Sequence, residues 1–318
     1  MNTIYGPDKY VSPFTDFGFK RLFGSEANKE LLRSFLNALL ADEEYIEALE
    51  FMNPEQFGSQ SFERKAVFDI YCHNQRNEPF IVEMQCARQD YFKDRALFYA
   101  TFPIREQALK GKEWNFQLKH VYAIGILNFS FDNDPDCIRT VMLGEIEKRK
   151  VFYEKLKFIF VELPKFKKTE GELTTLIEKW LYALVNFSFF DERPAVLNEP
   201  VFQQLFAEAE IAHLSSAEQT AYEESLKIAR DNYAIVTSAR SEGKQLGLSE
   251  GERIGLVKGE QIGLAKGEQI GLAKGEQIGL AKGEQIGIEK CKSVVVQQMK
   301  EMGMRAEQIE DLLRKMTQ

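Results

Sequence analysis

Two acidic residues, Asp69 and Glu83, stand inside apolar stretches where a strand would ordinarily carry hydrophobic side chains. A polar turn at residues 74–78 joins the two stretches, and each acid lies seven residues from Arg76. A hairpin centred on Arg76 therefore places Asp69 directly opposite Glu83, with Cβ atoms roughly 4.5–5.5 Å apart. Two carboxylates this close on half-buried strands repel each other, so one is protonated or a cation lies between them. A divalent metal ion would satisfy both acids.

Strand alternation gives this hairpin one apolar face and one mixed face. The apolar face, which we expect in the core, comprises Ala66, Phe68, Ile70 and Cys72 opposite Phe80, Val82, Met84 and Cys86. The mixed face comprises Val67, Asp69 and Tyr71 opposite Ile81, Glu83 and Gln85, with Lys65 at its outer end. The alternative is a solvated hairpin edge whose acids pair with Arg64 and Lys65. The local pattern leaves both interpretations open.

The composition bounds the class of protein. The chain of 318 residues has a net charge of −8, and residues 241–318 hold 12 Lys+Arg and 12 Asp+Glu, so the negative excess lies in residues 1–240. Global charge therefore gives no sign of nucleic-acid binding. The four cysteines show no CxxC spacing and the three histidines are scattered, which argues against a zinc site. No stretch reaches the ~20 apolar residues of a membrane span, so we expect a cytoplasmic protein without membrane contact.

The elements around the hairpin alternate between helical and strand patterns. Helices are expected over residues 16–24, 25–40, 91–110, 172–190 and 196–240. Strands are expected over residues 46–52, in both arms of the hairpin, and over 121–129, 137–143 and 157–163. This order predicts an α/β fold in which helices cover the faces of a mixed sheet.

The C-terminal tail, from Gly243 onward, consists largely of short repeats. Six octads, three of them GEQIGLAK, place glycine at every fourth position from Gly243 to Gly287. These glycines cost an isolated helix roughly 12 kcal/mol relative to alanine, and an eight-residue period fits no coiled coil. We expect a marginal helix or a flexible spacer, with ordering by self-association as an alternative. Amphipathic spacing then predicts one or two short helices within residues 289–316.

The spacing of Asp69, thirteen residues and then Glu83-Met84-Gln85 resembles the PD-(D/E)XK nuclease superfamily. The chain looks like one branch of it, the Rpn family of recombination-promoting nucleases and transposases. Further matches are the run from Asp16 to Gly24 (DFGFKRLFG), residues 35–40, Tyr91, Arg95 and Tyr99, and the glycine-punctuated tail. The resemblance implies a restriction-endonuclease-like nuclease core at 1–190, a helical extension at 191–242, repeats at 243–290 and short helices at 291–318.

The resemblance also implies an activity, that of a Mg²⁺-dependent DNA endonuclease acting in recombination or on mobile DNA, with Mn²⁺ or Ca²⁺ as alternative ions. Asp69 and Glu83 would ligate the metal. Gln85 occupies the position of the motif's lysine, and an amide orients water but carries no positive charge. Lys65 lies one cross-strand step from Gln85 in the predicted register, and we hypothesise that it supplies this charge.

A helix after the hairpin would meet the DNA backbone. Arg95 has Tyr91 and Tyr99 at i−4 and i+4, so all three can lie along one side and contact phosphate; an equal alternative is that Arg95 pairs with an acid while the tyrosines pack. Thr15 or Asp16 can cap the helix expected over residues 16–24, and for Asp16 the role of a cap is favoured over that of a ligand. Two other functions stay open: a catalytically weakened DNA-binding protein, and an interaction protein that forms homo-oligomers through its tail.

Overall fold

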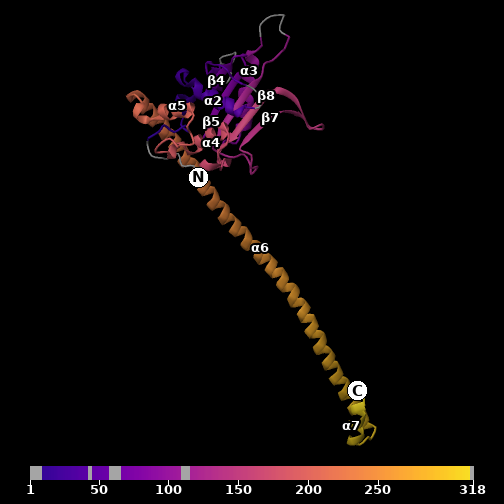
Figure 1. Ribbon diagram of the computed structural model, residues 1–318. Helices are drawn as coiled ribbons and strands as arrows, with labels where there is room; N and C mark the ends of the chain where they lie inside the picture. Colours follow the sequence, from indigo (N-terminus) through magenta and orange to yellow (C-terminus); the bar gives the residue numbers. More distant parts are fainter. Residues whose placement is uncertain (1–8, 42–44, 57–65, 109–114, 316–318) are drawn as a thin grey trace. The chain divides into compact units, whose positions relative to one another are not determined.

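The computed structural model describes residues 9–41, 45–56, 66–108 and 115–315 (Figure 1). Two compact units divide the chain between Ser238 and Ala239. No helix among the described residues is long and apolar enough to cross a membrane. The finer predicted division at residues 190, 242 and 290 stays a prediction.

A six-stranded mixed sheet forms the centre of the first unit, in the order β1-β4-β5-β6-β8-β7. Its strands are β1 (Leu49–Phe51), β4 (Ile70–Asn74), β5 (Pro79–Gln85), β6 (Val121–Leu127), β7 (Ile138–Glu145) and β8 (Lys150–Glu162). β5, β6 and β8 run parallel, and the other neighbours are antiparallel. A separate ribbon pairs β2 (Glu55–Gln56) with β3 (Ala66–Val67). The expected mixed α/β sheet is confirmed, and β6 is the fully buried strand predicted at residues 121–129.

Helices cover both faces of this sheet (Figure 1). One face carries α1 (Asp16–Phe23), α2 (Lys29–Leu39), α4 (Leu176–Asn186) and α5 (Pro200–Ala209), and the other carries α3 (Phe92–Glu106). Short 3₁₀ turns lie between these elements: η1 (Glu26–Asn28), η2 (Leu163–Lys165), η3 (Glu170–Glu172), η4 (Phe187–Phe189) and η5 (Ile211–His213). The side of the sheet that each helix covers decides which strand residues it contacts.

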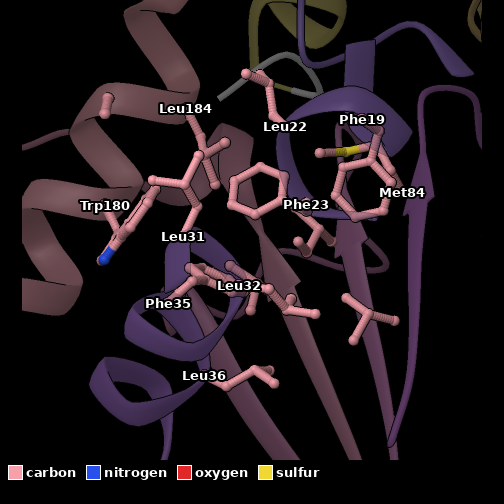
Figure 2. Close-up of a cluster of buried hydrophobic side chains, with 14 of the residues drawn as sticks. Phe19, Leu22, Phe23, Leu31, Leu32, Phe35, Leu36, Met84, Trp180 and Leu184 are labelled. Carbon is pink, nitrogen blue, oxygen red and sulfur yellow. The ribbon is translucent and has the colours of Figure 1, made fainter. Parts of the chain in front are cut away.

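The larger layer of the core lies between the sheet and the first group of helices. Trp180 of α4 is fully buried in the cluster that also contains Phe23 and Phe35 (Figure 2). The rings of Phe23, Phe35 and Phe202 lie 4.9–5.9 Å from the ring of Trp180. Burying a large apolar side chain contributes about 1.5–3 kcal/mol, so this cluster fixes α1, α2 and α5 against α4.

Phe68 lies on the opposite face from the one predicted. Its ring packs against Tyr71 and Phe102 beneath α3, whereas Ile70 enters the larger layer as expected. β4 begins only at Ile70, because the preceding β3 pairs with β2 and the chain bends at Asp69. The bend interrupts the two-residue alternation on which the prediction depended.

The C-terminal part of the chain is helical. Residues 196–240, which the sequence predicts to be helical, form α5, the turn η5 and the start of α6 (Ser216–Glu301), with a break between Ala209 and Ser216. α6 continues through all the octads, so the helical alternative is the one observed, and α7 (Ala306–Lys315) follows it. A Cβ built on any glycine from Gly243 to Gly287 meets no atom within 4 Å. The glycine row therefore has open space around it.

Candidate active site

The hairpin of β4 and β5 sets the two acids opposite each other. Ile70 pairs with Val82 and Tyr71 with Ile81, which is the register centred on Arg76. Asp69 occupies the bend just before β4, and Glu83 lies within β5. The predicted register is confirmed, although Asp69 precedes its strand instead of lying in it.

Hydrogen bonds hold both carboxylates in place. Asp69 donates its backbone N–H to Glu83 Oε1 at 3.1 Å, and the Met84 N–H donates to Asp69 Oδ2 at 2.8 Å. Gln85 donates its side-chain amide to Glu83 Oε2 at 3.4 Å. Each acid thus accepts a hydrogen bond from the backbone of the facing segment, and the Gln85 amide bonds to Glu83.

The electrostatics of the pair are unfavourable without a cation. Burial, followed by the negative charge of Asp69, raises the pKa of Glu83 to about 8. Burial also raises the pKa of Asp69, while the Met84 N–H and the charges of Lys20 and Arg95 lower it. The pair therefore holds an extra proton near neutral pH, and a cation would displace that proton.

Arg95 approaches the acids from α3. Its guanidinium lies 5.4 Å from the ring centroid of Phe92 and 5.7 Å from that of Tyr99, and its Nη1 donates to Gln89 Oε1 at 2.6 Å. Its Nη2 is buried without a hydrogen-bond partner. Among the described residues Arg95 forms no ion pair, so its charge lowers the pKa of both acids only from a distance.

A small cavity lies between Arg95 and Glu83. Glu83, Arg95, Tyr99 and Gly125 help to line it, and its volume of about 20 Å³ has room for about one water molecule. Gly125 lies beside Glu83 in the register of β5 and β6, and a Cβ there would come within 3.3 Å of Phe92. A side chain at this position would therefore press on the rings of Phe92 and Phe160, which also line the cavity.

The remaining predicted residues differ in how close they lie to the acid pair and in how far they are buried. Tyr99 is partly buried, and its ring packs on Phe68 at 5.3 Å, whereas Tyr91 is 77% exposed at the start of α3. Lys65 lies outside the described residues. Of the two residues predicted as the cap of α1, Thr15 is the cap, because its side chain accepts from the Gly18 N–H, and Asp16 is the first residue of the helix.

Sequence reasoning gave no role to Lys20. Its charge lowers the pKa of both Asp69 and Glu83, and its Nζ forms an ion pair with Asp16 at 2.7 Å. The available signal was its place in the run from Asp16 to Gly24, some fifty residues before the hairpin. Nothing in the spacing of that run connects it with Asp69.

The donor set fits a divalent cation with a preference for oxygen. Mg²⁺ is commonly bound by one or two carboxylates, keeping water and substrate phosphate as its other ligands. Two adjacent carboxylates with raised pKa values provide that set. Among the described residues no further His, Cys, Asp or Glu side chain joins Asp69 and Glu83 in a cluster of three or more.

The six-stranded mixed sheet flanked by helices is consistent with a restriction-endonuclease-like fold. The family model for PD-(D/E)XK nuclease family transposases matches residues 13–239. This chain therefore belongs to that family. No curated protein and no solved structure matches it.

Proposed function

We propose that the chain is a metal-dependent endonuclease that hydrolyses phosphodiester bonds of DNA, in recombination or mobile-element biology. The observation that carries the proposal is the acid pair itself. Asp69 and Glu83 are held side by side with raised pKa values, and neither forms an ion pair with a described cation. All four cysteines are free, which is consistent with a reducing compartment such as the cytoplasm.

Each residue of the site has a distinct task in this proposal. Asp69 and Glu83 would hold Mg²⁺, which when bound polarises a phosphate oxygen and lowers the pKa of a bound water. Gln85, fixed by its bond to Glu83, would orient the attacking water. Arg95 has a spare donor beside the cavity and would contact a phosphate oxygen, since a guanidinium matches phosphate geometry.

Tyr91 and Tyr99 would support the DNA contact in different ways. Tyr99 packs against Phe68 and lies under the guanidinium of Arg95, so it would position Arg95. Tyr91 presents an exposed ring at the start of α3 and is free to meet the nucleic acid.

Cleavage of supercoiled plasmid by the full chain tests the proposal. We expect nicking or linearisation with Mg²⁺ or Mn²⁺, none with EDTA, and a loss of at least 100-fold in rate for Asp69→Asn and Glu83→Gln. Glu50→Gln, on the exposed side of the neighbouring β1, is the matched control and should retain the wild-type rate. Full activity in the Asp69→Asn/Glu83→Gln double variant would contradict the proposal.

A catalytically weakened DNA-binding protein is the second candidate, favoured by Gln85 in the place of the motif's lysine. This alternative requires DNA binding that persists in EDTA, falls steeply with added salt and leads to no cleavage. A filter-binding series over salt concentration, run beside the plasmid assay, separates the two functions.

A further inference from the structure

Gln89 lies in the segment between β5 and α3 and is bonded to α3 in two ways. Its backbone carbonyl accepts a hydrogen bond from the Phe92 N–H at 3.2 Å, in the first turn of the helix. Its side-chain oxygen accepts a second bond, from Arg95 Nη1 at 2.6 Å. The backbone bond fixes where the side chain of Gln89 begins, so that its amide can reach the guanidinium one turn further along α3.

The guanidinium of Arg95 also contacts two aromatic rings. Its Cζ lies 5.4 Å from the ring centroid of Phe92 and 5.7 Å from that of Tyr99. Such contacts attract a cation to the face of a ring, but they do not distinguish one guanidinium nitrogen from another. A hydrogen bond is directional, so the bond to Gln89 is the contact that decides which nitrogen is held and which is left.

The nitrogen that is left has no described partner. Nη2 of Arg95 is buried and forms no hydrogen bond with the described residues, and Arg95 lines the small cavity together with Glu83. Buried donors are nearly always paired in folded proteins, so an unpaired one beside a candidate site indicates a group that serves a ligand. A phosphate oxygen suits this donor, because the planar fork of a guanidinium matches phosphate geometry.

We propose that Gln89 is a positioning residue for the substrate phosphate: by accepting from Nη1, it turns Nη2 of Arg95 toward a phosphate oxygen of DNA beside Asp69 and Glu83. The inference rests on the proposed nuclease function and adds a residue that no motif of the sequence indicated. The side chain of Gln89 is exposed, and its only hydrogen bond with the described residues is the one to Arg95. Gln89 therefore acts through Arg95 and takes no part in the chemistry itself.

A double-mutant cycle on the cleavage kinetics tests this dependence on Arg95. Gln89→Met keeps the length of the side chain and removes the acceptor, and we expect kcat/KM to fall about tenfold. In the Arg95→Met background the same change should have no further effect, because the group that Gln89 positions is absent. Gln203→Met is the matched control and should retain the wild-type kcat/KM, because Gln203 is also exposed and its amide bonds to the Asn198 carbonyl, on α5.

Two kinetic results would overturn the inference. The first is an unchanged kcat/KM in Gln89→Met. The second is an equal loss in the wild-type and Arg95→Met backgrounds, which would show that Gln89 contacts the DNA directly.

Nitrogen-15 NMR of the full chain labelled with [¹⁵N]arginine tests the hydrogen bond without cleavage. A guanidinium bonded at one nitrogen rotates slowly about its Cζ–Nε bond and gives separate Nη signals, whereas a free one gives an averaged signal. The Arg95 signals, identified by their loss in Arg95→Met, should be separate in wild type, in Gln203→Met and in Gln89→Glu, which keeps an acceptor at the same length. They should be averaged in Gln89→Met.

Separate Nη signals in Gln89→Met would show that Gln89 does not hold Arg95 and would overturn the inference even if the kinetics changed. If the wild-type chain cleaves no DNA with any metal, the nuclease proposal fails. The NMR comparison then still tests whether Gln89 positions Arg95.

Discussion

At the scale of single residues, the site consists of two neighbouring carboxylates, Asp69 and Glu83, and no described cation forms an ion pair with either of them. Asp69 and Glu83 accept backbone hydrogen bonds, which hold their geometry, but these bonds do not cancel the desolvation of two neighbouring carboxylates. The arrangement sacrifices stability of the metal-free protein to hold two ligands in position, as functional sites commonly do.

The acid pair should make the metal-free protein less stable as pH rises. Glu83 has an ordinary pKa of 4.5 when unfolded and a pKa of about 8 in the fold. Between these values only the unfolded chain loses the proton, so the free energy of unfolding falls with pH and becomes constant above about 8. Urea titrations in EDTA at pH 5 to 9 should show this decline in wild type and a smaller one in Glu83→Gln. Parallel curves for the two proteins would show that Glu83 ionises at its ordinary pKa.

Gly18 should be intolerant of a side chain. A Cβ there would lie 2.0 Å from the Ser12 carbonyl oxygen, where the chain turns into α1. We expect Gly18→Ala to lower the free energy of unfolding by about 1–3 kcal/mol or more, because backbone must move to make room. Gly171→Ala, at a glycine with no atom within 4 Å of the added Cβ, is the control for thermal denaturation. Equal melting temperatures would contradict the close approach at Ser12.

At the scale of elements, α6 is helical although its octads have a low helix propensity. Within the GEQIGLAK octads Glu and Lys stand two or six residues apart, so they form none of the i,i+3 or i,i+4 pairs that support isolated helices. Eight residues also advance an α-helix by about 80° beyond two full turns. The row of glycines therefore winds around α6, and no single face of the helix presents all of them to a straight helix packed alongside.

Alanine in the glycine row should stabilise the helix. Substituting Gly263, Gly267 and Gly271 adds three methyl groups that meet no atom within 4 Å, and each favours the helix by about 1 kcal/mol. We expect slower amide hydrogen exchange in these octads and a stronger circular dichroism signal near 222 nm. Gln261→Ala with Gln269→Ala is the control, because glutamine is already a good helix former. Unchanged exchange in the triple variant would show that another contact limits the helix.

The hairpin register could be predicted from sequence because two local signals agree. The polar turn fixes the centre, and the alternation of Ile70, Tyr71 and Cys72 fixes the faces. The same reasoning failed at Phe68, where β3 pairs with a different strand and the chain bends. The effect of Lys20 on the pKa values of the two acids could not be predicted, because it depends on how α1 packs, which no local pattern encodes.

At the scale of the whole molecule, the first turns of α6 belong to the first unit. Tyr222 is buried and accepts a hydrogen bond from the Ser12 N–H at 3.0 Å, and Glu218 forms an ion pair with Arg21 at 2.5 Å. The rest of α6 and α7 form the second unit from Ala239 onward. Residues 216–238 thus pack against the nuclease-like core and form part of it.

Two truncations should separate these roles. A chain ending at Ser238 should melt at the same temperature as the core of the full protein. A chain ending at Ser215 should melt about 10 °C lower, since it loses about 3 kcal/mol with the buried Tyr222. Light scattering on the first truncation also tests self-association, because an oligomer formed through the tail must become a monomer. Equal melting of the two truncations would show that Tyr222 adds nothing to the core.

The octads of α6 have a consequence at the level of the gene. The three GEQIGLAK octads carry the same side chains, and a Cβ built on their glycines meets no atom within 4 Å, so removing one of them leaves the contacts of the others unchanged. Because a copy is a whole number of codons, slippage between repeated DNA segments adds or removes octads without shifting the reading frame. Tail length can therefore vary in large steps during replication, while residues 9–238, which carry the acid pair, keep their sequence and their fold.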